Sequence, residues 1–448
     1  MLSIINRNLV FPLIEMIRHE PIRNCLKELN KSQWYSYDQL KEIQWNKLKK
    51  LIEYSYYNVE YYKNCFDSNK ISPSDIKSFE DFSKIPLLSK KDIRTAGKDI
   101  YSKIYDGKVE ECKSGGTQGK PLYLVRDSLS SAYGRAAYYR CLNWYGLRIG
   151  DKQLRVWGLP LNIEKAKKEI RKDSILNRIR ISAFDIKKEI IYKSYKLIKN
   201  FKPVYMYGYV SGIVKICQLM RDENLDGRAL KIKYAVTTAE MISESQRKII
   251  EDFLDCSVIN EYGCGEVSVV ASECPAGNLH VNMENVLVES IQKNPDQKDS
   301  KEIILTNLNS FSMPLLRYRI CDTGNLVESK CACGRKLEII DSITGRIVNM
   351  LLSTDGRYIA GNIFRYIAFD FITKYKGIKD FKVIQKQKKK IEIILSKDTN
   401  FSDNLLEKFT AEVKKILGQD MKITYQFQKD IALEKSGKRL FVYSELSE

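Results

Sequence analysis

The chain has 448 residues, and 44% of them are hydrophobic, which is enough for a large core and more than one domain. This composition excludes a disordered chain. No apolar run has the length of a transmembrane helix, and the first ten residues lack the apolar segment of a signal peptide. The eleven cysteines are typical of reduced thiols or metal ligands, so we expect a cytoplasmic protein.

The formal net charge is +19, from 75 basic and 56 acidic residues. A charge of this size would suit a nucleic-acid or membrane partner, but the excess is mostly lysine and is spread along the chain. We interpret the basic run 164–172, followed by 175–181, as an amphipathic helix or flap, and the run 385–390 as a hairpin turn. We therefore expect no specific nucleic-acid partner. An anionic partner such as a carrier protein, a CoA tail or a membrane surface stays open.

Residues 1–100 are predicted to be helical, with the clearest helix at Gln39–Asn64. Beyond them, strands alternate with helices, which is typical of parallel sheets covered by helices. The predicted strands are Leu122–Arg126, Gln153–Trp157, Val204–Tyr207, Lys231–Thr237 and Ser257–Ile259. The predicted helices are Ser128–Tyr145, Val210–Asp222 and Ser243–Leu254.

Further along, the pattern predicts a smaller antiparallel portion and then a compact α+β unit. The strands of the antiparallel portion are Asn285–Glu289, Glu302–Leu308 and Leu326–Glu328. The elements of the last hundred residues are helix Asn362–Phe371, hairpin Phe381–Leu395, helix Asp403–Leu417 and strand Met421–Gln426. The sequence thus predicts an α/β body followed by a small α+β domain.

Residues 113–121, Lys-Ser-Gly-Gly-Thr-Gln-Gly-Lys-Pro, have the composition of a phosphate-binding loop. The glycines let backbone N–H groups approach an anion, and Lys120 adds a positive charge. The segment is not a Walker loop, because Ser114 and Pro121 stand where that pattern has glycine and Ser or Thr. Taken alone, it could equally be a plain surface turn.

Five segments, in order, resemble the motifs of adenylate-forming enzymes, the superfamily of acyl-CoA synthetases and adenylation domains. They are residues 113–121, Asn260-Glu-Tyr-Gly-Cys-Gly-Glu266, Arg317-Tyr-Arg-Ile-Cys-Asp-Thr-Gly324, Gly345-Arg346 and Ser436-Gly-Lys438. The chain resembles in particular the phenylacetate–CoA ligase-like branch, including its capsular-polysaccharide-biosynthesis (CapK-like) type, over nearly its whole length. The resemblance implies an adenylation body at 1–345, a hinge at 346–352 and a mobile lid at 353–448.

The resemblance implies an AMP-forming carboxylic acid ligase. ATP would activate the acid as an acyl-adenylate, and an acceptor, most often the thiol of coenzyme A, would displace AMP. An adenylating amide or ester synthase with an amine or sugar acceptor, in polysaccharide or secondary-metabolite biosynthesis, is one alternative. A basic scaffold protein that has lost catalysis is another. Val348 and Asn349 replace acidic residues common after the Gly-Arg of relatives, which leaves the second half-reaction open. The oligomeric state is open too, with a homodimer as one alternative.

The resemblance also implies individual roles. Thr117 would lie near Mg²⁺, and Glu266 would supply an oxygen ligand to that ion. Tyr262 would flank the adenine, and Asp322 would accept hydrogen bonds from the ribose hydroxyls. Lys438 would bridge the substrate carboxylate and the α-phosphate. The residues implied to bind ATP and its metal are Ser114, Gly115, Gly116, Thr117, Gln118, Gly119, Lys120, Ala239, Glu240, Tyr262, Gly263, Glu266, Asp322 and Arg346.

A second set, Cys274, His280, Cys331 and Cys333, has the composition of a structural zinc site. Three thiolates and one imidazole fill a tetrahedral coordination sphere, so zinc would join two loops rather than catalyse. The same branch carries a similar Cys…His…Cys-x-Cys-Gly-Arg pattern. The alternative is two independent loops with unrelated thiols.

Trp157, Tyr207 and Tyr209 are predicted to line the acid pocket, near the ends of their strands. Aromatic walls suit an aryl or other flat apolar acid. Ordinary packing would use the same residues, and no sequence rule identifies the acid.

Overall fold

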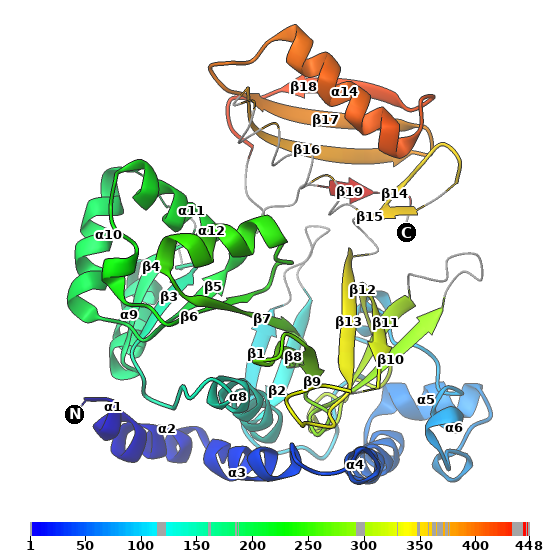
Figure 1. Cartoon of the computed structure of the whole chain (residues 1–448). Coiled ribbons are helices and arrows are strands. Elements are labelled where there is room, and N and C mark those ends of the chain that lie inside the picture. The colour runs from blue at the N-terminus through cyan, green and yellow to red at the C-terminus, as the bar shows by residue number, and fades with distance from the viewer. Residues whose placement is uncertain are drawn as a thin grey trace.

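A computed structural model describes residues 2–113, 122–159, 163–183, 186, 188–292, 301–328, 330–346, 350–356, 358–360, 364, 371, 375, 377–431, 442–444 and 446. These residues form an 11-stranded sheet surrounded by helices and a separate four-stranded sheet near the C-terminus (Figure 1). The predicted α/β body with a small α+β unit is confirmed. No helix in this part of the chain combines the length and hydropathy that a membrane crossing requires.

The N-terminal region is helical, as predicted, and runs along the side of the body opposite the C-terminal sheet (Figure 1). The single helix predicted at Gln39–Asn64 is wrong, because the chain is extended at Val59 (φ −126°, ψ 112°) and splits there into two helices. Val59 is buried in the core, and its β-branched side chain favours the extended conformation. The elements are α1 (Leu2–Ile5), a π-helical turn (Asn6–Val10), α2 (Phe11–Arg18), α3 (Ile22–Ser32), α4 (Tyr37–Asn58), α5 (Glu60–Ser68), α6 (Phe79–Phe82) and α7 (Lys90–Ala96).

The predicted parallel and antiparallel portions of the body form one continuous sheet. Its order is β10-β11-β12-β13-β9-β8-β7-β6-β5-β3-β4. Strand β7 joins the two portions: it pairs in parallel with β6 up to Asn260 and antiparallel with β8 from Glu261. The strands are β3 (Gln153–Trp157), β4 (Arg178–Ser182), β5 (Tyr205–Tyr209), β6 (Tyr234–Thr238), β7 (Ser257–Cys264), β8 (Ser268–Glu273), β9 (Leu279–Val281), β10 (Val286–Gln292), β11 (Lys301–Asn307), β12 (Tyr318–Val327) and β13 (Ile339–Arg346).

Helices cover both faces of the parallel portion. One face packs against α10–α12 through an apolar core that includes Val156, Met206 and Ala235. The other face packs against α8. The flap predicted at 164–181 is wrong in its second half, because residues 178–182 form the edge strand β4. The helices are α8 (Ser128–Asn143), α9 (Ile163–Ile175), α10 (Lys188–Phe201), α11 (Val210–Asp222) and α12 (Glu244–Leu254).

A two-stranded antiparallel unit frames the predicted phosphate loop. Strand β1 (Val109–Lys113) pairs with β2 (Tyr123–Asp127), and Lys113 lies opposite Tyr123. The loop residues 114–121 connect these two strands and lie outside the described residues. The predicted loop therefore begins and ends at paired strands.

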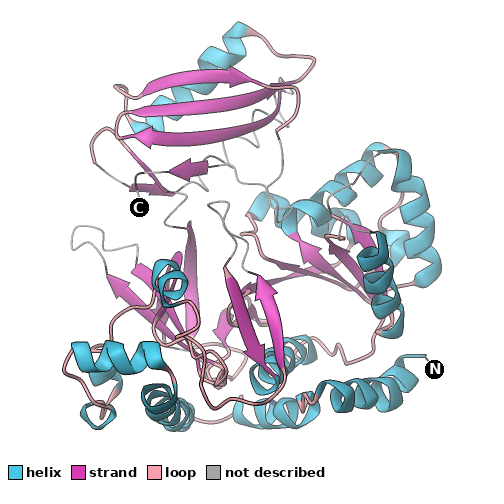
Figure 2. Ribbon diagram, turned by 180° about the vertical axis from the view of Figure 1, so that it is seen from behind, coloured by secondary structure: helices cyan, strands magenta, loops and turns pink. Residues whose placement is uncertain are grey.

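The C-terminal sheet has the order β18-β17-β16-β19 and carries α14 on one face (Figure 2). Its core includes Phe381, Ile393, Phe409 and Val413. The hairpin turn predicted at 385–390 is confirmed, whereas the helix predicted at 362–371 lies largely outside the described residues. The elements are β14 (Met350–Leu352), β15 (Tyr358–Ala360), β16 (Ile378–Gln387), β17 (Lys390–Lys397), α14 (Asp403–Leu417), β18 (Lys422–Phe427) and β19 (Val442–Ser444).

Candidate functional site

The predicted site residues that the structure describes gather at the carboxyl ends of the parallel strands. Strand β3 ends at Trp157, β5 at Tyr209 and β6 at Thr238, and β7 continues into its antiparallel half at this edge. Ligands of open α/β sheets bind in the crevice outside these strand ends. The loop Ser114–Lys120 and Lys438 lie outside the described residues, so their positions remain predictions.

Tyr262 and Asp322 are in direct contact. The Tyr262 hydroxyl donates a hydrogen bond of 2.9 Å to Asp322 Oδ2. Asp322 lies on strand β12 and is 8% exposed, so it is a buried strand residue and not part of a turn. In the β12–β13 ladder its backbone is paired with that of Arg346. Three of the residues assigned to the nucleoside thus lie together, contributed by β7, β12 and β13.

A second hydrogen bond joins β12 to the turn that follows β7. The Tyr318 hydroxyl, also on β12, donates a hydrogen bond of 3.0 Å to Glu266 Oε1. Both side chains are buried. Burial, together with the charge of Glu266, raises the pKa of Tyr318 far above its usual range, so this phenol stays protonated and remains a donor. Sequence analysis did not single out Tyr318, although it lies inside a recognised motif.

Backbone strain marks two of the predicted positions. Ala239 (φ 65°) and Cys321 (φ 64°) adopt the left-handed conformation, and each directly precedes a predicted site residue. Such conformations cost free energy in residues other than glycine and cluster at binding sites. The carboxylate of Glu240, next to Ala239, accepts hydrogen bonds from the Ser211 N–H (2.7 Å) and hydroxyl (3.0 Å). Glu240 therefore caps the start of α11, a structural role that its sequence motif did not reveal.

The three predicted pocket aromatics are in mutual contact. The rings of Trp157 and Tyr207 stack with centroids 5.8 Å apart, and those of Trp157 and Tyr209 are 4.2 Å apart. The Tyr207 hydroxyl donates a hydrogen bond of 2.8 Å to Glu261 Oε1. Burial raises the pKa of Glu261 to about 6. The sequence predicted the aromatic cluster but missed the carboxylate beneath it.

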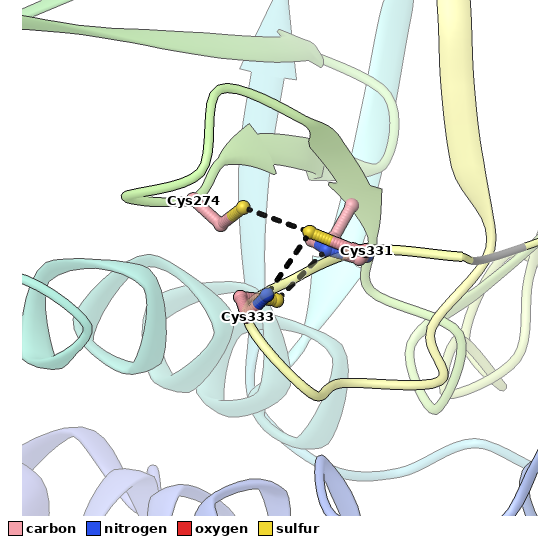
Figure 3. Close-up of side chains that lie close together, drawn as sticks. Cys274, Cys331 and Cys333 are labelled. Carbon is pink, nitrogen blue, oxygen red and sulfur yellow. Dashed lines mark hydrogen bonds between the residues drawn. The ribbon is translucent and has the colours of Figure 1, made fainter.

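The predicted zinc ligands also come together, and Figure 3 shows the three cysteines among them. Their four ligand atoms lie within 4.8 Å of one another. Cys274 Sγ is 3.6 Å from Cys331 Sγ, and Cys333 Sγ is 3.3 Å from His280 Nε2. In a tetrahedral zinc site with the usual bond lengths, ligand atoms are separated by about 3.5–3.8 Å. The arrangement fits such a site, and the two loops that carry these residues lie side by side.

The surroundings favour the metal-binding protonation state of His280 and Cys331 but not that of Cys274. Nδ1 of His280 lies 3.0 Å from the carbonyl oxygen of Leu337, an arrangement that fixes the ring and leaves Nε2 to face the thiols. Burial lowers the pKa of His280, which favours the neutral imidazole that a metal needs. Burial raises the pKa of Cys274 to about 12. For Cys331, burial also acts to raise the pKa, but hydrogen bonds, that from the Cys333 N–H foremost, outweigh it and lower the pKa.

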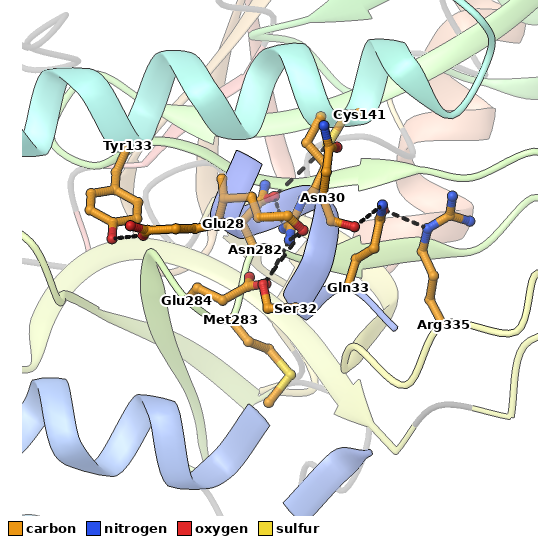
Figure 4. A network of polar contacts seen from close by, with 12 residues as sticks. Glu28, Asn30, Ser32, Gln33, Tyr133, Cys141, Asn282, Met283, Glu284 and Arg335 are labelled. Atoms are coloured by element: carbon orange, nitrogen blue, oxygen red, sulfur yellow. Dashed lines mark hydrogen bonds and ion pairs between the residues drawn. The ribbon is translucent and has the colours of Figure 1, made fainter. Parts of the chain in front are cut away.

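Arg335 holds the loop that carries Cys331 and Cys333 against the ends of α3 and α8. The Arg335 guanidinium lies between the rings of Trp34 (4.7 Å) and Trp144 (4.5 Å) and donates to Gln33 Oε1 at 3.1 Å. Gln33 belongs to a polar network between α3, α8 and the segment around residues 282–284 (Figure 4). At its centre Arg140 forms a fully buried ion pair of 2.7 Å with Glu284.

Comparisons with a family model, with characterised proteins and with solved structures each find CapK-like proteins or CoA ligases. Residues 351–445 match the family model described as the CapK C-terminal domain. The chain is 24% identical over 424 residues to Protein CapK of Staphylococcus aureus, an alignment covering 90% of this chain and 89% of the relative. It is 26% identical over 331 residues to phenylacetate-coenzyme A ligase of Aromatoleum evansii, covering 71% and 72%. The crystal structure of 2-hydroxyisobutyryl-CoA ligase in the postadenylation state superposes with a TM-score of 0.70 at 16% identity, covering 91% and 90%. The last match shows a shared fold.

Proposed function

We propose that this chain, which belongs to the adenylate-forming superfamily in its phenylacetate–CoA ligase-like and CapK-like branch, activates a carboxylic acid with ATP. A carboxylate is a poor acyl donor because it is anionic and has no good leaving group. Attack of a carboxylate oxygen on the α-phosphorus of ATP, with departure of pyrophosphate, gives an acyl-adenylate. The proposed acceptor is the thiol of coenzyme A, whose sulfur then forms a thioester as AMP leaves.

The observation that carries this proposal is the contact between Tyr262 and Asp322. An ionised carboxylate can accept hydrogen bonds from both hydroxyls of a ribose, and an adjacent aromatic ring offers a flat surface to the base. Arg346, opposite Asp322 in the ladder, would assist from the hinge side. These residues would hold the nucleoside, while Ser114–Lys120 would hold its phosphates.

Glu266 is the proposed ligand of Mg²⁺. It is buried and hydrogen-bonded to a neutral phenol, and it forms no ion pair with any lysine or arginine that the structure describes. A buried carboxylate without a counter-charge fits a hard divalent cation that prefers oxygen ligands. When bound, that ion would neutralise part of the phosphate charge. Thr117 is proposed as its neighbour in the loop.

We also propose that Cys274, His280, Cys331 and Cys333 hold a structural zinc ion. The four donors would complete the coordination sphere and leave no position open for catalysis. The distances between the ligand atoms support this role. Its contribution would be to join β8 and β9 to the loop before β13.

A second candidate function is transfer of the activated acyl group to an amine or a sugar. The match of residues 351–445 to the CapK C-terminal domain favours it, as does the similarity to Protein CapK, and a role in surface-polysaccharide synthesis would follow. A cytoplasmic location and a homodimer are compatible with either function. Parallel assays with CoA, hydroxylamine and amino sugars would separate the two.

The test is acid-dependent release of pyrophosphate from ATP and Mg²⁺, measured across aryl, hydroxy, amino and fatty acids with hydroxylamine as a trap. Lys438→Ala should lose adenylate formation by several orders of magnitude while keeping the unfolding temperature of the wild type. Lys435→Ala, three residues away, is the matched control and should remain active. Normal adenylation by Lys438→Ala, or an absence of ATP binding by the wild type, would contradict the proposal.

A further inference from the structure

One face of the parallel portion is unusually rich in arginine. Arg180, Arg155 and Tyr207 are register partners across β4, β3 and β5, so their side chains project from the same face. Arg178 and Tyr205 belong to the neighbouring row, on the same side. The opposite face is the apolar core beneath α10–α12.

Within the described residues, two of the three arginines on this face have no ion-pair partner. Arg180 pairs with Asp173 at 2.5 Å and with Glu169 at 3.3 Å, both from α9. Arg155 and Arg178 form no ion pair within the described ranges, and Arg155 Nε is buried without a hydrogen-bond partner there. Glu261 accepts a hydrogen bond from Tyr207 and forms no ion pair with Arg155, although the charge of Arg155 acts to lower the pKa of Glu261 against the larger effect of burial.

Aromatic rings surround the unpaired guanidinium. The Arg155 guanidinium carbon is 5.1 Å from the ring centre of Trp157 and 5.4 Å from that of Tyr207. Ring faces attract a cation but do not supply the hydrogen-bond acceptors that a guanidinium requires. Burial, with the charge of Arg178 next to it, lowers the pKa of Arg155, yet an arginine remains protonated at neutral pH. The Arg155 side chain is half-buried, and a partly desolvated cation without an ion-pair partner costs folding free energy, so its retention fits a ligand that brings the counter-charge.

Arg155 lies next to the aromatic residues that are predicted to line the pocket for the carboxylic acid substrate. Trp157 and Tyr209 stand at the strand ends that face the nucleotide residues, and Arg155 lies two residues before Trp157, one step deeper along β3. Because the stacked rings leave no gap between them, a ligand that reaches Arg155 would lie against the ring cluster, with the end at Arg155 directed away from the site of adenylation. A bidentate guanidinium is well suited to a carboxylate.

We propose that Arg155 binds a second anionic group of the acid substrate, so that the enzyme selects dicarboxylic acids over monocarboxylic acids of the same skeleton. This inference rests on the proposed function and adds the class of acid to it. One carboxylate reacts with ATP, and the other accepts hydrogen bonds from the Arg155 guanidinium. The connecting carbon skeleton lies against the face of the aromatic cluster formed by Trp157 and Tyr207.

Two matched acid pairs test this: terephthalate against 4-methylbenzoate, and glutarate against pentanoate. At constant ionic strength, we expect the wild type to release pyrophosphate with a kcat/KM at least about tenfold higher for the diacid of one or both pairs. Arg155→Met should lose this preference, and Arg155→Lys should retain part of it. Arg221→Met is the control, because Arg221 also lies over an aromatic ring, that of Phe253, but on α11 behind the other face.

A second measurement does not depend on turnover. Each diacid should raise the unfolding temperature of the wild type and of Arg221→Met more than its monoacid partner does, and Arg155→Met should lose that difference. Equal kcat/KM for both members of each pair, or a diacid preference that persists in Arg155→Met, would overturn the inference while leaving adenylation intact. If no acid releases pyrophosphate, a diacid-specific thermal shift that needs Arg155 would support the anion site and count against adenylation. Absence of that shift as well would overturn the inference.

Discussion

Replacing Cys333 by serine should destabilise the body by removing one ligand of the proposed zinc ion. The ion would join positions 57 residues apart, since Cys274 and Cys331 both bind it. Closing a chain loop of that length restricts the unfolded state by about 4 kcal/mol when treated as a covalent cross-link. For a body of this size, that loss corresponds to a fall in Tm of about 5 °C.

The assay combines metal analysis of purified protein with scanning calorimetry, with and without a chelator. The wild type should contain one zinc ion per chain, and Cys333→Ser should contain much less and unfold at a lower temperature. Cys65→Ser, which removes a half-buried thiol outside the cluster, should keep the metal. Full zinc occupancy in Cys333→Ser, or an unfolding temperature that is indifferent to the chelator in the wild type, would refute the reasoning.

Three further predictions concern the body. Asp322→Asn should raise the KM for ATP by about 10- to 100-fold, because it removes a charged acceptor; an unchanged ATP dependence in steady-state kinetics would exclude the ribose role. Arg140→Met should lower the free energy of unfolding by about 3–5 kcal/mol in urea titrations, because Glu284 would stay buried without its partner. The double variant with Glu284→Met should recover much of that loss; failure to do so would show that the network, rather than the stranded charge, sets the cost. The pKa of Glu261 is raised from 4.5 to about 6, so its carboxyl group stabilises the fold below pH 4.5, and on the order of 2 kcal/mol is lost as the pH rises through 6. Glu261→Gln should flatten the Tm–pH curve in that window, and an unchanged slope would contradict the assignment.

The sequence predicted the residues of local motifs better than their partners. Cys331 and Cys333 lie two residues apart in one short motif, and the distant Cys274 and His280 were added by residue type and by the similar pattern of the branch. Tyr262 and Asp322 were assigned to one site from separate motifs, and their side chains are in contact. The Tyr318–Glu266 contact was not predicted, because it depends on how β12 lies against the turn after β7, which no local pattern contains.

The sequence of β3, which contains Arg155, already indicates that the sheet has one polar face. The strand Gln-Leu-Arg-Val-Trp alternates polar and apolar residues, a pattern that indicates a sheet with one polar face. The companion strand Arg-Ile-Arg-Ile-Ser has the same alternation, but the basic helix before it led us to assign its first residues to a flap. The arginine-rich face becomes visible only when the two strands are paired.

Strand β19 has a consequence for protein engineering. It is the edge strand of the C-terminal sheet and pairs with β16 through only three residue pairs, at Val442–Ser444. Strand β18 ends at Phe427 and β19 begins at Val442, so the connection that contains Lys438 starts and finishes in the same sheet. A tag or a short deletion at the C-terminus that dislodges β19 would remove one of these two attachment points. Activity lost in such a preparation would then reflect the displaced strand, although no residue of the binding site had been changed.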